Sequence, residues 1–203
     1  MGRRVFVTAS TGAAATQIGG QTIHAFAGVG HAGESAADLA RHVASSYKAK
    51  KRWLACETLV IDEISMLDAS TFDKLDHVAR YVRGNDKPFG GVQLLCCGDF
   101  LQLPPVSARG GFAFEAKCWR RCFPEQRALT RVFRQSGDDA FLQILGELRI
   151  AKLSNKSAAL LRRLKHTDLS EWTSRGIEPT RLQCYNADVD SINEARLKAL
   201  KTA

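Results

Sequence analysis

Three short apolar runs divide the first half of the chain into alternating strand and helix segments. They cover residues 4–9 (RVFVTA), 58–61 and 92–97. Each run is strand-sized and apolar at consecutive positions, which is typical of strands in a parallel sheet covered on both faces. A helical pattern separates the last two runs. This pattern therefore predicts an α/β fold, in which a parallel sheet is flanked by helices.

The clearest helical pattern covers residues 68–83. Ser70 and Asp73 resemble a capping pair at its start, and Gly84 is a typical stop. Its apolar side chains recur at helical spacing: Phe72, Leu75, Val78, Ala79 and Val82. Further elements are predicted as helices at 13–15, 34–54, 138–149, 155–164 and 187–200, and as a strand at 180–185.

The pattern restarts near Leu129, which indicates a domain boundary between residues 125 and 135. We predict a first domain at 1–128 and the start of a second domain at 129–203.

Composition is that of an ordinary globular chain, with 45% apolar and 25% charged residues among 203. This excludes disorder over the whole chain. No apolar run approaches the ~18 residues of a membrane-spanning helix, so no membrane partner is expected. The formal net charge of +8 favours a polyanionic partner. A merely basic surface accounts for the same excess equally well.

The six cysteines are expected to be reduced thiols, because no secretory pattern is seen and a chain of this size folds without disulfides. Cys118 and Cys122 are spaced like half of a metal site. No second pair with zinc-like spacing completes it, so no metal is predicted there.

The sharpest chemical signal is LVIDEISML at residues 59–67, where an apolar strand ends in Asp62 and Glu63. Open α/β sheets bind ligands at the carboxyl ends of their strands. In nucleoside triphosphatases the first carboxylate holds Mg²⁺ and the second deprotonates the attacking water. A structural turn capped by two carboxylates is the alternative explanation.

A second strand ends in the same way within LLCCGDFLQLPP, residues 94–105. Gln102 follows the strand end, where its amide can donate to a γ-phosphate oxygen. No G-x-x-x-x-G-K-[ST] phosphate loop occurs in the chain. Because triphosphate needs such a cradle, we expect the sequence to be a fragment whose phosphate loop lies before residue 1.

Residues 62–106 (DEISMLDASTFDKLDHVARYVRGNDKPFGGVQLLCCGDFLQLPPV) resemble the PIF family of 5′-to-3′ DNA helicases, the petite integration frequency helicases. Residues 7–30 are similar to the family's motif Ia, and residues 129–149 are similar to its motif IV. Residues 179–200 resemble its next strand and helix. The family fold implied by this resemblance is two RecA-like domains with ATP between them.

The resemblance also implies roles for particular residues. Asp62 and Glu63 are expected to serve Mg²⁺ and the attacking water. Gln102 and Arg134 are expected to contact the γ-phosphate. The residues expected to line a path for single-stranded DNA are Ser10, Thr11, Thr22 and His24. A small wedge insertion is expected around residues 28–52, which gives the basic cluster at 48–52 a possible DNA role.

Two departures from the family pattern stand out. The family's motifs V and VI are expected after residue 203, and Ile150-Ala151 replaces a glycine that the family tends to place after the motif IV helix. The resemblance implies an ATP-dependent helicase acting on single-stranded and forked DNA in repair, recombination and telomere or organelle genome maintenance, in the nucleus or the mitochondrion. A non-catalytic nucleic-acid-binding remnant and an unrelated triphosphatase acting on protein partners are the alternatives.

Overall fold

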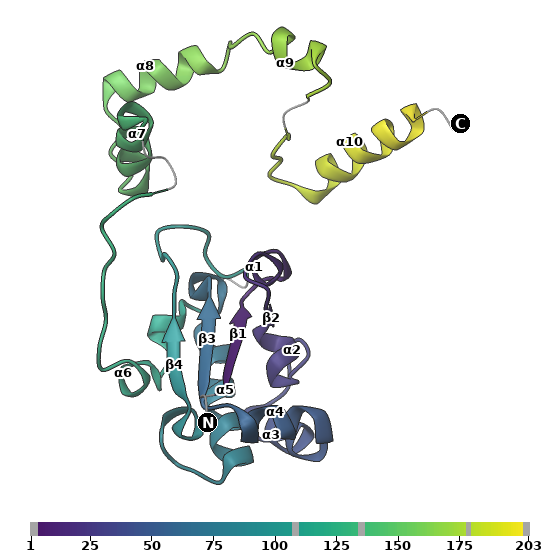
Figure 1. Ribbon diagram of the computed structural model, residues 1–203, viewed down its shortest axis with the longest axis vertical. Helices are drawn as coiled ribbons and strands as arrows, with labels where there is room; N and C mark the ends of the chain where they lie inside the picture. The colour runs from purple at the N-terminus through teal and green to yellow at the C-terminus, as the bar shows by residue number, and fades with distance from the viewer. Residues whose placement is uncertain (1–3, 107–109, 134–136, 178–179, 201–203) are drawn as a thin grey trace. The chain divides into compact units, whose positions relative to one another are not determined.

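The computed structural model describes residues 4–106, 110–133, 137–177 and 180–200. Its centre is a four-stranded parallel sheet with the strand order β2–β1–β3–β4. The strands are β1 (Val5–Ala9), β2 (Gln21–Thr22), β3 (Thr58–Asp62) and β4 (Gln93–Cys96). Figure 1 shows β4, β3 and β1 side by side with their arrows pointing the same way. The predicted α/β class and the three predicted strands of this sheet are confirmed, whereas β2 is too short to be detected as a pattern.

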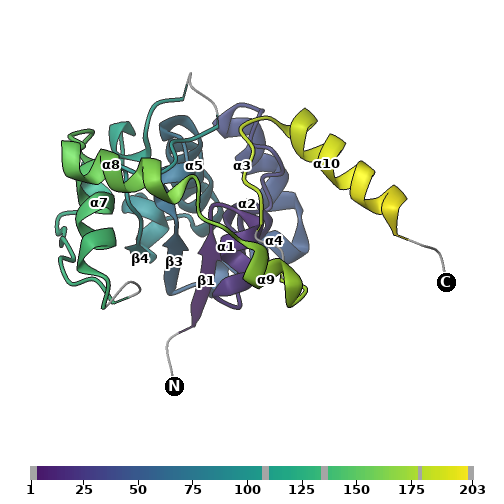
Figure 2. The ribbon, with the colours of Figure 1, turned by 90° about the horizontal axis from the view of Figure 1, so that it is seen from above.

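Helices cover one face of this sheet. They are α2 (Ile23–Ala27), α3 (Ala36–Ser45), α4 (Tyr47–Ala55) and α5 (Ala69–Arg83), which share one hydrophobic core with the strands. Helix α1 (Gly12–Gln17) follows the carboxyl end of β1. Figure 2 shows α3 and α5 on the same side of β1, β3 and β4. On this side, the ring of Phe26 lies 5.2 Å from that of Phe6 and 5.0 Å from that of Trp53, measured between centroids. These rings join β1, α2 and α4 in one core.

The opposite face of the sheet is covered only in part by the described residues, with Val7 and Val60 half-buried. Val5 of β1 and Leu95 of β4 are 52% and 56% exposed. Leu59 and Ile61 on the other face of β3 are fully buried. A uniformly apolar strand predicts that both faces of its sheet are buried. It does not predict which segments of the protein bury them.

Residues 34–54 form two helices instead of the single one predicted. Ser46 ends α3 and caps α4, and its extended backbone (φ −79°, ψ 107°) breaks the helix. Its Oγ accepts a hydrogen bond from the N–H of Ala49 at 3.5 Å. A serine that offers its oxygen to the backbone competes with helix continuation, and no periodicity of apolar residues reveals that.

Helix α5 matches its prediction, except at its cap. Asp68, not Ser70 with Asp73, begins the helix, because Asp68 Oδ1 accepts from the N–H of Thr71 at 2.8 Å. Gly84 ends it in the left-handed conformation (φ 60°), which glycine adopts without a Cβ clash. Asp73 instead accepts hydrogen bonds from the N–H groups of Lys117 and Cys118.

Short helical turns and two helices complete the first part of the chain. They are η1 (Ile64–Met66), η2 (Pro88–Gly91), η3 (Ala113–Glu115), α6 (Trp119–Cys122) and α7 (Asp139–Arg149). Helix α7 confirms the helix predicted at 138–149. Ala151 after it adopts the left-handed conformation (φ 54°) at the point where the family tends to have glycine. The helix therefore ends where a glycine would end it, although the alanine Cβ makes that conformation less favourable.

By internal contacts the chain divides into two compact units, residues 1–152 and 153–203. This division lies beyond the predicted boundary at 128–129, which stays a prediction for the domains of the complete protein. The second unit contains α8 (Asn155–Leu164), α9 (Ser170–Ser174) and α10 (Asn186–Ala199). All six cysteines are free. Among the described residues, the helices are too short or too polar to span a membrane.

The strand predicted at 180–185 is wrong. These residues form no regular element, and Leu182 is 93% exposed. A segment with strand-forming residues becomes a strand only where another strand supplies hydrogen bonds, and the regular elements in the described part of the second unit are helices.

Candidate functional site

The carboxyl end of β3 carries Asp62 and Glu63 in an unusual backbone geometry. Asp62 is the last residue of the strand, and Glu63 adopts the left-handed conformation (φ 52°, ψ 43°). For a residue with a Cβ, this conformation costs about 1–2 kcal/mol. The N–H of Glu63 donates to Asp62 Oδ1 at 2.9 Å, and the N–H of Ile64 donates to the carbonyl of Cys97 at 3.0 Å. Strain of this kind is often found at functional sites.

Ser10 fastens the end of β1 to this turn. The strands pair so that Ala9 faces Asp62, which places Ser10 beside Glu63. The N–H of Ser10 donates to the carbonyl of Asp62 at 3.1 Å, and its Oγ donates to the carbonyl of Glu63 at 2.7 Å. Both hydrogen-bond donors of Ser10 therefore bind backbone carbonyls of the acidic pair. Its predicted role as a DNA contact is untested and stays a prediction.

The carboxyl end of β4 is built around Asp99. Asp99 Oδ1 accepts from the N–H of Leu101 at 3.1 Å, and Oδ2 accepts from Gln102 Nε2 at 3.1 Å. Asp99 also forms an ion pair with Arg149 of α7. The carboxylate thus organises the loop that presents Gln102, whose side chain is exposed.

Opposing effects act on the pKa of Asp99. Burial on its own raises the pKa of this carboxyl, but the hydrogen bonds from Leu101 and Gln102 and the charge of Arg149 outweigh it. The pKa of Asp99 therefore lies below its ordinary value, and the group is ionised at neutral pH. The glycine before it allows the two strand ends to meet, because a Cβ on Gly98 would lie 3.0 Å from the backbone nitrogen of Ile64.

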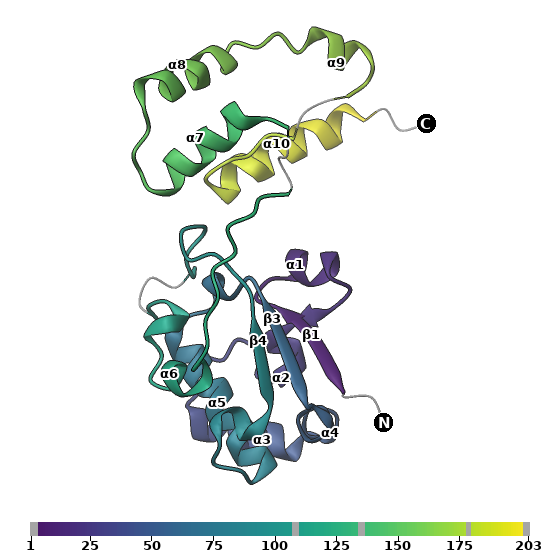
Figure 3. The same ribbon diagram turned by 60° about the vertical axis from the view of Figure 1, so that its left-hand side comes forward.

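Thr11 and Thr22 begin the two helices that follow β1 and β2. Thr11 Oγ1 accepts from the N–H of Ala14, and Thr22 Oγ1 accepts from the N–H of Ala25, both at 3.2 Å. Each hydroxyl acts as a cap through its oxygen, so its O–H can still donate to another group. Figure 3 shows α1, which Thr11 caps, at the carboxyl end of β1. This is the end of the sheet that carries Asp62 and Glu63.

His24 in α2 is half-buried. Burial lowers its pKa, the carboxylate of Asp68 raises it in part, and His31 lowers it further. The net shift is downward, so the ring is mainly uncharged at neutral pH. Any contact it makes with a polyanion would rest on hydrogen bonding or stacking, not on charge.

The basic cluster at residues 48–52 divides into two parts. Arg52 donates to the carbonyls of Phe26 and Ala25 at 2.7 and 2.9 Å, so it holds the end of α2. Lys48, Lys50 and Lys51 are exposed on α4. The possible DNA role therefore remains for the three lysines, while Arg52 is structural.

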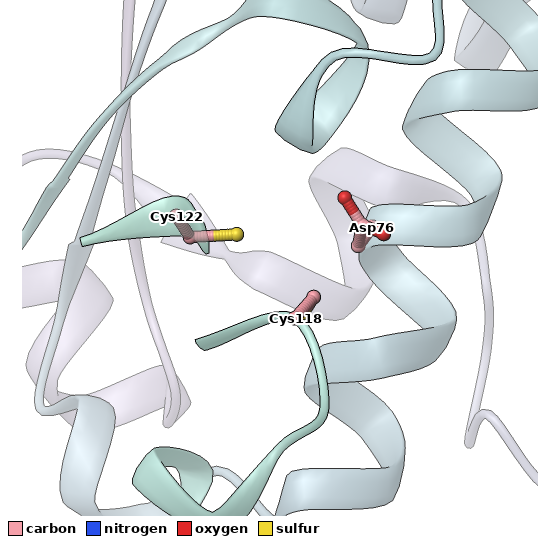
Figure 4. Close-up of side chains that lie close together, drawn as sticks. All are labelled: Asp76, Cys118 and Cys122. Atoms are coloured by element: carbon pink, nitrogen blue, oxygen red, sulfur yellow. The ribbon is translucent and has the colours of Figure 1, made fainter. Parts of the chain in front are cut away.

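Asp76, Cys118 and Cys122 form the one group of potential metal ligands found among the described residues. Figure 4 shows Asp76 on α5 facing the two cysteines, and their ligand atoms lie within 4.8 Å of one another. Both carboxylate oxygens of Asp76 are already in use: Oδ1 accepts from the N–H of Phe89 at 2.8 Å, and Oδ2 accepts from Arg80 Nε at 2.9 Å. The hydrogen bond with Cys122, and then burial, raise the pKa of Cys118. A neutral thiol beside an occupied carboxylate is a poor metal ligand, so this group fits a packing role.

Sequence reasoning missed the polar side chains through which α5 holds the surrounding loops. Arg83 donates to the carbonyls of Trp53, Cys56 and Gly90. Asp76 fixes Phe89, which has a left-handed backbone (φ 49°). The four-residue spacing of Asp76 and Arg80 is a signal for their own ion pair, but no local pattern indicates the distant carbonyls.

The structure brings several of the predicted site residues to one end of the sheet. Ser10 contacts the turn of Asp62 and Glu63, and that turn is hydrogen-bonded to the end of β4, before the loop of Gln102. Thr22 pairs with Ala9 in the neighbouring strand. Arg134 lies outside the described residues, so its predicted contact with the γ-phosphate stays a prediction.

A parallel sheet with an acidic pair and a polar loop at the ends of adjacent strands fits a RecA-like α/β domain. The sequence profile of the PIF1-like helicase family matches residues 1–156, and the chain belongs to that family.

Individual helicases are similar to this chain in sequence and in structure. The ATP-dependent DNA helicase PIF1 of Rattus norvegicus is 48% identical over 198 residues, which cover 95% of this chain and 30% of that protein. The Pif1 helicase from Candida albicans is similar in structure, with a TM-score of 0.90 and 39% identity over 99% of this chain and 45% of the other. The Bacteroides Pif1 helicase in complex with ADP-AlF3 and single-stranded DNA has a TM-score of 0.80 and 28% identity over 100% of this chain and 49% of the other. The chain therefore spans less than a third of the length of the rat relative.

Proposed function

We propose that the protein to which this chain belongs is an ATP-dependent DNA helicase. It would couple ATP hydrolysis to 5′-to-3′ movement on single-stranded DNA and to unwinding of forked DNA. The observation that carries the proposal is the contact between Ser10 and Glu63, at 2.7 Å, beside the ordered loop of Gln102. It joins the segment expected to meet DNA to the carboxylates expected to meet ATP. The direction of movement, and a role in repair, recombination and telomere or organelle genome maintenance, follow from the family resemblance alone.

Glu63 is the proposed general base. A base must hold the attacking water and accept its proton, which contributes about 10²–10⁴-fold to the rate. Its backbone is held by hydrogen bonds on both sides, which fix the direction of its Cα–Cβ bond. Gln102 is proposed to donate to the γ-phosphate from a loop that Asp99 keeps ordered.

Asp62 is the proposed residue for Mg²⁺. Its carboxylate is half-buried at a strand end, and the described residues give it one hydrogen bond, from the N–H of Glu63. Carboxylate oxygen is the ligand that Mg²⁺ prefers, so the residue fits the ion. When bound, Mg²⁺ neutralises charge on the phosphates.

Thr11 and Thr22 are proposed to donate hydroxyl hydrogen bonds to the DNA backbone, with exposed lysines of α4 adding charge. Contacts of this kind carry little base information. We therefore expect affinity for single-stranded DNA that falls as salt rises, with slight sequence preference. Arg134 is proposed to reach the γ-phosphate when the two domains close, and this part rests on the motif IV resemblance only.

The test is ATP hydrolysis by the complete protein, with and without single-stranded DNA, together with unwinding of forks that carry a 5′ or a 3′ tail. We expect DNA to stimulate hydrolysis and only the 5′-tailed fork to be unwound. Salt-sensitive DNA binding without hydrolysis would support the non-catalytic alternative instead. Preference for the 3′ tail would contradict the direction alone.

A further inference from the structure

The hydroxyl of Ser10 makes one of the hydrogen bonds that join β1 to β3. It donates to the carbonyl of Glu63 at 2.7 Å, across 53 positions of sequence. The backbone N–H of Ser10 donates to the preceding carbonyl, that of Asp62, at 3.1 Å. Ser10 thus holds two successive carbonyls, one on each side of the Glu63 α-carbon.

Glu63 needs such support because its backbone is in the left-handed region. A residue with a side chain adopts this conformation only where its surroundings enforce it. Three further hydrogen bonds support this turn. The N–H of Glu63 donates to Asp62 Oδ1 at 2.9 Å, the N–H of Met66 donates to the carbonyl of Glu63 at 3.1 Å, and the N–H of Ile64 donates to the carbonyl of Cys97 at 3.0 Å. Asp62 and Ser10 both support the turn through side-chain oxygens, but the Ser10 hydroxyl is the one that reaches it from β1 and that a substitution can remove without changing the acidic pair.

Ser10 also belongs to the segment that leads into α1. Thr11 directly after it is the cap of α1, through its contact with Ala14. A ligand that binds Thr11 acts on a residue one peptide bond away from the clamp. The segment therefore has two faces: the Thr11 hydroxyl can still donate outward, and the Ser10 hydroxyl is engaged with Glu63.

We propose that Ser10 is a positioning residue that couples DNA contact at the β1–α1 segment to the orientation of Glu63. The inference rests on the proposed function, since it needs Glu63 as the base and Thr11 near DNA. DNA bound at Thr11 fixes the segment, Ser10 then fixes the Glu63 carbonyl, and the carboxylate is held toward the attacking water. In this proposal Ser10 is not a direct DNA ligand. It links the β1–α1 segment, which binds DNA, to the base Glu63.

Thr8 provides a matched control. Its Oγ1 donates to the carbonyl of Val60 at 2.6 Å, so it joins the same two strands by the same kind of bond. Thr8 is fully buried within β1, and its acceptor, the carbonyl of Val60, lies inside β3 before the Glu63 turn. Loss of that bond weakens the sheet without releasing Glu63.

The experiment compares the complete wild-type protein with Ser10→Ala, Ser10→Thr and Thr8→Val. ATP hydrolysis is measured at saturating ATP with and without saturating single-stranded DNA, and DNA affinity and melting temperature are measured in parallel. We expect Ser10→Ala to lower the DNA-stimulated kcat about tenfold, the equivalent of about 1.4 kcal/mol. The KM for ATP and the Kd for DNA should stay within about twofold. Ser10→Thr keeps a hydroxyl and should restore the stimulation, whereas Thr8→Val should lower the melting temperature and leave the stimulation ratio unchanged.

Three results would overturn the inference. Normal kcat at saturating DNA with weakened DNA affinity would return Ser10 to the role of a direct DNA ligand. A lowered melting temperature with an unchanged stimulation ratio would make Ser10 structural, like Thr8. Equal loss of stimulation in Thr8→Val would show that any weakening of the β1–β3 pair suffices. If Ser10→Ala does not fold, Ser10→Cys, which keeps the volume and replaces the hydroxyl by a weak donor, takes its place. A wild-type protein without DNA-stimulated hydrolysis would instead contradict the proposed function itself.

Discussion

The ends of β3 and β4 look alike in the sequence, since each is an apolar strand followed by an acidic turn, yet the structure uses their carboxylates differently. Asp99 after β4 accepts hydrogen bonds from Leu101 and Gln102 and pairs with Arg149. The described residues give the Glu63 side chain after β3 no hydrogen bond, and its support acts on the backbone. One carboxylate is committed to ordering a loop, and the other has no fixed donor among the described residues.

Under the proposed function, this difference is the one expected between an acid that orders the fold and an acid that serves as the base. A carboxylate whose oxygens are filled by fixed donors cannot accept a proton from water, because those donors stabilise the charged form. A carboxylate on a strained, clamped backbone is both oriented and available. Asp76 belongs with Asp99, because the N–H of Phe89 and the guanidinium of Arg80 fill its two oxygens.

The comparison is tested most strongly by the same change at both strand ends, Glu63→Gln and Asp99→Asn, in the complete protein. Glu63→Gln keeps the size of the side chain but removes the base, so we expect kcat to fall about 10³-fold with ATP binding retained. Asp99→Asn should lower kcat far less. Steady-state hydrolysis and nucleotide binding measure both. Similar losses at the two positions would remove the distinction between them.

Asp76→Ala should cause the largest loss of stability. It leaves the N–H of Phe89 without its acceptor and Arg80 without its partner, and breaking a buried pair in this way costs about 3 kcal/mol. Asp76→Asn keeps an acceptor for Phe89 and should cost less. Denaturant unfolding of this chain measures the free energy of unfolding. If Asp76→Ala lowered the free energy of unfolding by less than the ~1 kcal/mol of an exposed ion pair, Asp76 would not have the structural role assigned to it.

Asp99→Asn should have a moderate effect through Gln102. The amide keeps an oxygen for one donor but loses the charge, so the loop loosens, and we expect kcat to fall about tenfold, which corresponds to about 1.4 kcal/mol. Combining it with Gln102→Ala should add little, since both act on the same loop. Additive losses would indicate that Asp99 and Gln102 act independently.

The same variant gives a pH prediction with a definite sign. The pKa of Asp99 is lower in the folded than in the unfolded chain. Its charge therefore stabilises the fold at pH values above the unfolded pKa of about 4, and this contribution is lost as pH falls through the lower, folded pKa. The stability difference between the wild type and Asp99→Asn should shrink on acidification below that range. A difference that stays constant would contradict the assignment.

Arg149→Ala should have the smallest effect. Its side chain is about half exposed, and exposed ion pairs contribute less than about 1 kcal/mol. Asp99 keeps its two loop donors without it, so Gln102 stays in place. Thermal unfolding and hydrolysis should both stay close to wild type, with any difference reduced further by salt. A loss as large as that of Asp99→Asn would make the arginine, and not the loop donors, the main partner of Asp99.

Elements that depend on nearby residues were predictable from the sequence. The apolar repeat of α5 and its stop at Gly84 follow from side chains three or four positions apart and from the backbone freedom of glycine. The strand ends with Asp62–Glu63 and Gly98–Asp99 were likewise visible as apolar runs that stop at charged residues. Where a second local arrangement competes, as at Ser46 within residues 34–54, the prediction failed by joining two helices.

The tertiary structure alone decided which distant groups these elements serve. Asp73 looked like part of a helix cap but accepts from the N–H groups of Lys117 and Cys118. Arg52 belongs to a basic cluster with a possible DNA role, but its guanidinium donates to the carbonyls of Phe26 and Ala25. The segment at 180–185 lacks a partner strand among the described residues and stays irregular. The sequence determined by itself that two acidic strand ends exist, because local patterning places them. Only the pairing of β1 with β3 decided that Ser10 meets Glu63, because a hydrogen bond across 53 residues depends on strand order and register, which no local pattern encodes.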